Sequence, residues 1–303
     1  MDTLDGHPDF MNELVPDMEQ TLLPFASPSE EDVYQQRVAA PLDRKIDAAI
    51  KLLRNSEPLA LRDDPQNGYH LCYSGGKDSD VILELAKMAG VKHRAVYNVT
   101  TLDPPELVYY IKGRPEPIHW NRPKHSFFHM LSEIKTNGPP TRLSRWCCEV
   151  YKEHGGDGKV KVTGVRGPES PRRKKLWKPI VANKEGTIVC PIVYWTDEDV
   201  WEFHRLRGLT HCCLYDEGFS RLGCVGCPLS NNRRKEFARW PGYERQWKRA
   251  VQRYWDRLHG QPNRYGKPRW FEKFVDADGL WGWWMREDTT PVDDCQTRLL
   301  FTN

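Results

Sequence analysis

Residues 74–79 bring two glycines, a lysine, an aspartate and two serines together in one run, Ser-Gly-Gly-Lys-Asp-Ser. Glycines let a backbone approach a ligand closely, and the lysine adds a positive charge beside it. The serine hydroxyls can donate to phosphate oxygens, and the aspartate can cap a helix or hold a Mg²⁺ ion that bridges phosphates. The run predicts a nucleotide-binding phosphate loop formed by Ser74, Gly75, Gly76, Lys77, Asp78 and Ser79.

The sequence on either side of the loop supports this prediction. Residues 69–73 form a short apolar run typical of a strand, and apolar residues recur at helical spacing from Val81 to Gly90. The free N–H groups in the first turn of such a helix point at an anion. The alternative is an ordinary glycine-rich turn, and the pattern differs from the longer Gly-x-x-x-x-Gly-Lys-[Ser/Thr] loop.

Four cysteines form a second constellation. Cys147 and Cys148 are adjacent, and Cys224 and Cys227 have the C-x-x-C spacing that places two sulfurs on one ion or cluster. Adjacent cysteines suit a [4Fe–4S] cluster better than a structural zinc knuckle, so we expect the cluster, with zinc as the competitor and disulfides ranked lower. Two further cysteines remain alternates for the first pair: Cys212 and Cys213.

The phosphate loop resembles that of the ATP-pyrophosphatase and phosphoadenosine phosphosulfate (PAPS) reductase superfamily. The cysteine pattern is similar to that of assimilatory adenylyl-sulfate reductases, which carry a [4Fe–4S] cluster, so the resemblance is to an iron–sulfur-containing branch. The loop is closer to the ATP-cleaving members, including the sulfurtransferases of DNA phosphorothioation. Residues 195–201 and 215–224 also resemble the family, and the match covers roughly residues 40–230.

The resemblance implies an adenine-nucleotide α-hydrolase-like (Rossmann-like) fold and an ATP-dependent enzyme. An acceptor oxygen would attack the α-phosphate, Mg²⁺ near Asp78 would offset charge, and sulfur would then displace AMP. Lys77, Asp78 and Arg166 are the expected catalytic residues. The implied partners are an adenine nucleotide and a sulfur donor or reductant protein.

Two other functions remain open. The reductases carry a C-terminal Glu-Cys-Gly-[Leu/Ile]-His motif, whereas this chain has Asp294-Cys295-Gln296. Reduction of adenylyl sulfate or PAPS, with Cys295 as the nucleophile, is the first alternative. The second is a non-catalytic module that binds a nucleic acid or a protein partner.

Alternating strand and helix patterns predict an α/β fold with a parallel sheet flanked by helices. The carboxyl ends of parallel strands line one crevice, and Arg166 ends one of these strands. The basic residues 172–175 follow in an expected loop, where they either clamp a polyphosphate or sulfate or are simply solvated. The expected strands cover residues 69–73, 95–99, 117–120, 160–166 and 187–193, and the main expected helices cover residues 42–53, 81–89, 104–111, 126–134 and 145–152.

Composition and charge divide the 303-residue chain into three regions. Residues 1–38 form an acidic arm, residues 39–230 the phosphate-loop domain, and residues 231–303 a basic, tryptophan-rich helical extension. In that extension an apolar stripe is expected to be core, while the opposite basic face could bind a nucleic acid. The stripe is Tyr243, Trp247, Val251, Trp255 and Leu258, and the basic face is Arg245, Lys248, Arg249 and Arg253.

The nine cysteines and the length of the apolar runs indicate the cellular compartment in which the protein is expected. An odd cysteine count, no secretory segment at the start and no apolar run of membrane-spanning length predict a cytoplasmic protein without a membrane partner. Cys72 and Cys190 lie within expected strands and are expected to be core thiols.

Overall fold

The computed structural model describes residues 29–153, 155–183 and 186–286. The chain divides between Ala39 and Ala40 into two units. In the first unit, helix α1 (Glu30–Val38) begins at a capping box in which the Ser29 side chain accepts from the Asp32 N–H. The remainder of the predicted acidic arm and the tail with Cys295 lie outside the described residues.

The second unit contains a six-stranded sheet with the order β3-β2-β1-β4-β6-β5. Five strands are parallel, and β5 pairs antiparallel with β6. This arrangement confirms the predicted α/β fold with a mostly parallel sheet flanked by helices. The strands are β1 (Tyr69–Tyr73), β2 (His93–Asn98), β3 (His119–Asn121), β4 (Lys161–Val162), β5 (Ile180–Asn183) and β6 (Gly186–Val189).

Strand β5 was not among the expected strands. It is an edge strand of four residues that pairs only with β6, in the register Ile180 opposite Val189. Ile180 is 44% exposed, and the strand has only four residues, so its short sequence gives a weaker signal than the longer buried strands of the sheet.

Helices account for most of the remaining described residues of this unit. Apart from short 3₁₀ and π segments, they are α2 (Leu42–Asp63), α3 (Lys77–Ala89), α4 (Pro105–Lys112), α5 (Phe127–His129), α6 (Trp146–Cys148), α7 (Pro171–Leu176), α8 (Asp197–Arg207), α9 (Arg233–Arg239), α10 (Pro241–Leu258) and α11 (Ala277–Arg286). None of the described helices is both long and apolar enough to cross a bilayer.

Helix α3 is packed between the sheet and two other helices, because both β1 and α2 lie against it and α8 packs on it as well. Its residues Val81, Ile82 and Leu85 are buried. The helix ends at Gly90, which adopts the left-handed conformation common at helix C-termini. The start of α3 is therefore held firmly at the carboxyl end of β1.

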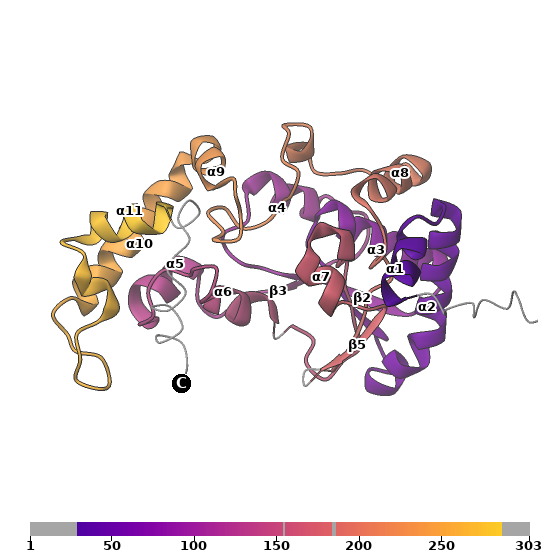
Figure 1. The fold of residues 1–303 in the computed structure, drawn as a ribbon, viewed down its shortest axis with the longest axis horizontal. Coiled ribbons are helices and arrows are strands. Elements are labelled where there is room, and N and C mark those ends of the chain that lie inside the picture. Colours follow the sequence, from indigo (N-terminus) through magenta and orange to yellow (C-terminus); the bar gives the residue numbers. More distant parts are fainter. Residues whose placement is uncertain (1–28, 154, 184–185, 287–303) are drawn as a thin grey trace, which may run out of the picture. The chain divides into compact units, whose positions relative to one another are not determined.

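Helix α10 confirms the core interpretation of the apolar stripe. Trp247, Val251, Trp255 and Leu258 are buried, and Figure 1 shows α10 alongside α11 and next to α5. The Trp247 ring stacks on Trp284 of α11 with centroids 4.5 Å apart and lies 4.6 Å from the ring of Phe127 in α5. Trp247 thus joins the C-terminal helices to the sheet-bearing part of this unit.

We expect Trp247→Ala to lower the free energy of unfolding by about 3–5 kcal/mol, because it empties a fully buried site. Tyr265→Ala is the control, since Tyr265 is 63% exposed and its removal should change the unfolding free energy by less than about 0.5 kcal/mol. Urea denaturation of both variants measures the difference. Equal midpoints would contradict this account of the C-terminal helices.

Candidate functional site

The phosphate loop turns sharply between β1 and α3. Gly75 has φ +71°, and a Cβ atom there would lie 2.6 Å from Ile111 Cγ1, so both the conformation and the space require glycine. Gly76 is the N-cap residue, and α3 begins at Lys77. The sequence therefore forms the strand, loop and helix N-terminus that it predicts.

Two aromatic side chains from the segment that includes α8 hold the first residue of α3. The backbone N–H of Lys77 donates to the Tyr215 hydroxyl at 2.9 Å. The His204 ring nitrogen donates to the Lys77 carbonyl at 2.9 Å, and burial lowers the pKa of His204, which favours the neutral ring. Both contacts hold the backbone of the first residue of α3 in place.

The loop opens onto a cavity of about 900 Å³. The carboxyl ends of β1, β2 and β4 contribute to its wall, as expected for ligand sites in open α/β sheets. Five of the six predicted loop residues line it, whereas Gly75 lies behind them against α4. The lining residues from the loop and the strand ends include Ser74, Gly76, Lys77, Asp78, Ser79, Asn98 and Arg166.

Lys77 and Arg166 are each only 4% exposed although they line this cavity. The ammonium group of Lys77 lies 3.1 Å from Asp197 Oδ1, and Arg166 contacts the same oxygen at 2.9 Å. Arg166 also donates to Asp78 Oδ1 at 2.7 Å. The three predicted catalytic residues therefore lie together, and Asp197, which the sequence reading did not select, connects them.

The basic residues 172–175 lie in helix α7 and not in the expected loop. Ser170 caps this helix by accepting from the Arg173 N–H, which makes a helical turn favourable despite the repeated charge. Arg173 lines the cavity and contacts Glu169. Arg172 and Lys175 are exposed and are not among the residues that line the cavity.

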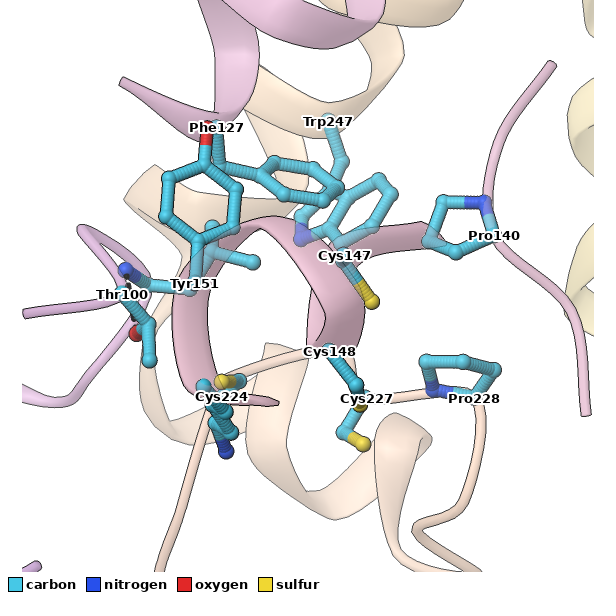
Figure 2. A pocket seen from close by; sticks show the side chains of 12 residues that line it. Thr100, Phe127, Pro140, Cys147, Cys148, Tyr151, Cys224, Cys227, Pro228 and Trp247 are labelled. Carbon is cyan, nitrogen blue, oxygen red and sulfur yellow. Dashed lines mark hydrogen bonds between the residues drawn. The ribbon is translucent and has the colours of Figure 1, made fainter. Parts of the chain in front are cut away.

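The four cysteines of the two predicted pairs line one small cavity of about 20 Å³ (Figure 2). Cys147 and Cys148 come from α6, and Cys224 and Cys227 come from the loop that precedes α9. All four are free thiols. The alternates lie elsewhere: Cys212 is 1% exposed in the core, and Cys213 is exposed to solvent.

The C-x-x-C loop is held by backbone and aromatic contacts. Val225 N–H donates to Leu102 O at 2.8 Å, and Trp247 Nε1 donates to Val225 O at 3.2 Å. Gly226 has φ +79°, and a Cβ atom there would lie 2.7 Å from Trp247 Nε1. Glycine is therefore required for the turn that brings the two thiols of the loop to the cavity.

Lys152 and Thr100 line both the cysteine cavity and the larger cavity. Negative charge at Cys224 is the main factor that raises the pKa of Lys152, so the ammonium form is favoured there. A hydrogen bond from Cys147 lowers the pKa of Cys148 to about 6, and Lys152 and Arg145 act in the same direction. Burial raises the pKa of the Cys224 thiol to about 11, although Lys152 opposes that shift.

A zinc ion and a [4Fe–4S] cluster place different demands on the four thiols of the small cavity. Within the described residues, no group of three or more His, Cys, Asp or Glu side chains converges on a point that could hold one metal ion. A structural zinc ion needs such convergence, because its sulfurs all lie about 2.3 Å from it. The four thiols line one cavity beside Lys152, and this all-sulfur donor set is of the kind that holds zinc or an iron–sulfur cluster.

Sequence reasoning missed several residues of the site. Lys152 follows Cys148 by four residues, a spacing that places both on one helical face and could have revealed it. Asp197 and Tyr215 lie in the segments 195–201 and 215–224 that resemble the family, but neither residue type nor spacing marks them as site residues there. Cys72, expected in the core, is half-buried and lines the large cavity, whereas Cys190 is fully buried as expected.

Comparison with known proteins gives a consistent set of relatives. An uncharacterized protein of Methanocaldococcus jannaschii is 28% identical over 198 residues, which cover 60% of this chain and 47% of the relative. Adenosine 5'-phosphosulfate reductase 2 of Bacillus subtilis is 30% identical over 107 residues, 33% of this chain and 45% of that enzyme. The chain spans about half the length of the curated relatives it matches.

Solved structures give further matches. A phosphoadenylyl-sulfate reductase from Candida auris in complex with phosphate has a TM-score of 0.43 at 16% identity and covers 65% of this chain and 96% of that chain. FMN adenylyltransferase of Candida glabrata, in complex with FAD and pyrophosphate, has a TM-score of 0.44 at 17% identity and covers 68% and 78%.

The sequence profile described as the phosphoadenosine phosphosulfate reductase domain matches residues 68–230. This segment begins just before β1 and contains the phosphate loop, Arg166 and all four cysteines of the small cavity. The chain belongs to the phosphoadenosine phosphosulfate reductase domain family.

Proposed function

We propose that this protein is an enzyme that binds ATP in the large cavity, cleaves it at the α-phosphate and uses the resulting adenylate for sulfur transfer. One observation carries the proposal. Lys152 and Thr100 line both the phosphate-loop cavity and the cysteine cavity, so a nucleotide and a thiolate-held group would be neighbours. A nucleotide-activating reaction coupled to sulfur chemistry uses both sites.

The reaction would proceed in two displacements. An acceptor oxygen attacks the α-phosphorus, the bond from that phosphorus to the bridging oxygen breaks, and pyrophosphate leaves with the electron pair. A sulfide sulfur then attacks the activated acceptor atom, and AMP leaves. Lys77 and Arg166 would stabilise charge on the phosphates, and Asp78 would hold a Mg²⁺ ion that offsets part of that charge.

The four thiols of Cys147, Cys148, Cys224 and Cys227 would hold a [4Fe–4S] cluster. Lys152, which lines the same cavity as the four cysteines, would balance part of its negative charge. When bound, such a cluster supplies electron transfer or sulfur coordination beside the nucleotide. Cys224 and Cys227 lie on a loop that Trp247 and Leu102 already hold in place, so the chain has these two ligands positioned in advance.

Reduction of adenylyl sulfate or PAPS is the second candidate function. The specific support is the 30% identity to a segment of an adenosine 5'-phosphosulfate reductase. Such a reaction would use Cys295 as nucleophile and a thioredoxin-like reductant, and this cysteine lies outside the described residues. A purely non-catalytic module would show neither nucleotide turnover nor sulfite release.

The acceptor in the favoured reaction could be a nucleic acid. The basic face of α10 supports this choice, because Arg245, Arg249 and Arg253 are exposed along one ridge of the helix. Residues 231–286 hold 14 lysines and arginines against six aspartates and glutamates, a balance suited to phosphodiester backbones. A sulfur donor protein would complete the set of partners.

Lys77→Ala should weaken triphosphate binding by about 1.5–3 kcal/mol, roughly 10- to 100-fold, since it removes a charge-assisted contact. The fold should persist, because the Asp197 side chain left without its lysine is 51% exposed and can be hydrated. Arg172→Ala is the control, as Arg172 is exposed and is not among the cavity-lining residues. Calorimetric titration with ATP measures both; wild-type affinity in Lys77→Ala would make the loop purely structural.

Anaerobically purified protein should be brown and contain about four irons per chain, because four thiolates suit a cubane cluster. Cys224→Ser should lose the colour and most of the iron. Cys213→Ser should keep both, since that cysteine is exposed and lies outside the small cavity. The iron and zinc contents of wild type and both variants measure this expectation. Stoichiometric zinc without iron in the wild type would contradict the proposal of a [4Fe–4S] cluster.

Cys295→Ser should retain most of the activity if ATP is the substrate, because that reaction needs no tail nucleophile. The test compares wild type and variant, each given ATP with candidate acceptors, or adenylyl sulfate or PAPS with thioredoxin. We expect acceptor-dependent release of AMP and pyrophosphate from ATP by both proteins. Sulfite formed by the wild type and abolished in Cys295→Ser would instead establish the reductase.

A further inference from the structure

The positive and negative side chains that line the large cavity are equal in number. Five are positive and five negative, although a polyphosphate ligand would add several negative charges to the same space. A phosphate group therefore meets carboxylates as well as cations when it enters. The positive residues are Lys77, Lys152, Arg166, Arg173 and Arg221, and the negative ones are Asp78, Asp103, Glu169, Asp197 and Glu198.

One carboxylate oxygen in this set occupies the position that suits a phosphate oxygen. Asp197 Oδ1 lies 3.1 Å from the Lys77 ammonium nitrogen and 2.9 Å from Arg166 Nη2. Lys77 and Arg166 are both more than nine-tenths buried. Two buried cations directed at one oxygen form an anion site, and the chain itself supplies the anion.

The neighbouring carboxylates are held differently. Asp78 is 26% exposed and accepts from Arg166 Nε at 2.7 Å. Its Cβ lies close to Gly164, where an added Cβ atom would be only 3.1 Å away, so there is little room for Asp78 to turn aside. The Asp197 side chain, by contrast, is 51% exposed and sits in the first turn of α8, facing solvent.

We propose that Asp197 is a displaceable internal counter-ion and that it sets how strongly the phosphate site discriminates between free and Mg²⁺-bound polyphosphate. Its carboxylate pairs with both Lys77 and Arg166. A free polyphosphate must expel this carboxylate or suffer its repulsion, whereas a Mg²⁺ complex brings charge that the carboxylate tolerates. This inference rests on the proposed nucleotide-binding function and names a specificity-determining residue within it.

The test uses inorganic pyrophosphate as the probe, titrated into the full-length protein with EDTA or with Mg²⁺. We expect Asp197→Asn to bind Mg²⁺-free pyrophosphate roughly 5- to 20-fold more tightly than wild type, because one repelling charge is gone while both cations remain. The increase in the affinity of Asp197→Asn for pyrophosphate should be smaller when Mg²⁺ is present. Asp197→Ser is the second variant and should show the same increase in pyrophosphate affinity as Asp197→Asn. The result then does not depend on the folding of a single variant.

Glu198→Gln is the matched control. Glu198 lies in the same turn of α8 and lines the same cavity, but it pairs with neither Lys77 nor Arg166. The affinity of Glu198→Gln for pyrophosphate should therefore stay within about twofold of wild type. The same gain in Glu198→Gln would attribute the effect to general cavity charge and overturn the proposal.

The remaining outcomes separate the inference from the proposed function. Pyrophosphate binding by wild type with unchanged or weaker binding by both Asp197 variants would overturn the inference alone and make Asp197 a residue that aligns the cations. Failure of wild type and all variants to bind pyrophosphate, with or without Mg²⁺, would overturn the nucleotide-binding function and the inference together.

Discussion

The site depends on two cations that are buried at the end of a parallel sheet. Removing a lysine and an arginine from water is costly unless carboxylates compensate them. Lys77 comes from the start of α3 and Arg166 from the end of the β4 segment, and the carboxylates that compensate them lie on α3 and α8. The relative positions of three separate elements are therefore fixed by the same charge pairs, and the positions of the loop and of the cavity wall follow from them.

The second part of the site depends on packing. Both cysteine-bearing segments contact an aromatic cluster around Trp247, whose ring meets Phe127 and Trp284 while its indole N–H donates to Val225. The C-terminal helices are thus part of the construction of the cysteine cavity. The exposed basic residues Arg245, Arg249 and Arg253 lie on the same helix as this buried anchor, so α10 combines a packed face with a positively charged one.

Features that depend on local sequence were predicted well. The phosphate loop, the main parallel strands and the start of α3 follow from glycine positions and apolar periodicity within a few residues. The grouping of Cys147, Cys148, Cys224 and Cys227 was predicted from the adjacent pair and the C-x-x-C spacing, and the structure brings all four to one cavity. Contacts between distant segments, such as those of Tyr215 and His204 with Lys77, could not be read from spacing, because they arise only when α8 packs on α3.

Helix α8 carries two carboxylates only two residues apart, Asp197 and Asp199, and they make different contacts. Asp199 accepts from the Thr196 N–H and also pairs with Lys45 of α2 at 2.5 Å, so it ties the helix start to a neighbouring helix. These contacts hold the backbone of this turn in place, so rotation about χ1 and χ2 is the simplest way for the Asp197 carboxylate to leave its partners. Such side-chain hops take picoseconds to nanoseconds at exposed positions, far faster than any hinge motion of a whole helix. The Asp197 carboxylate could therefore release Lys77 and Arg166 by a fast side-chain rotation while helix α8 keeps its position.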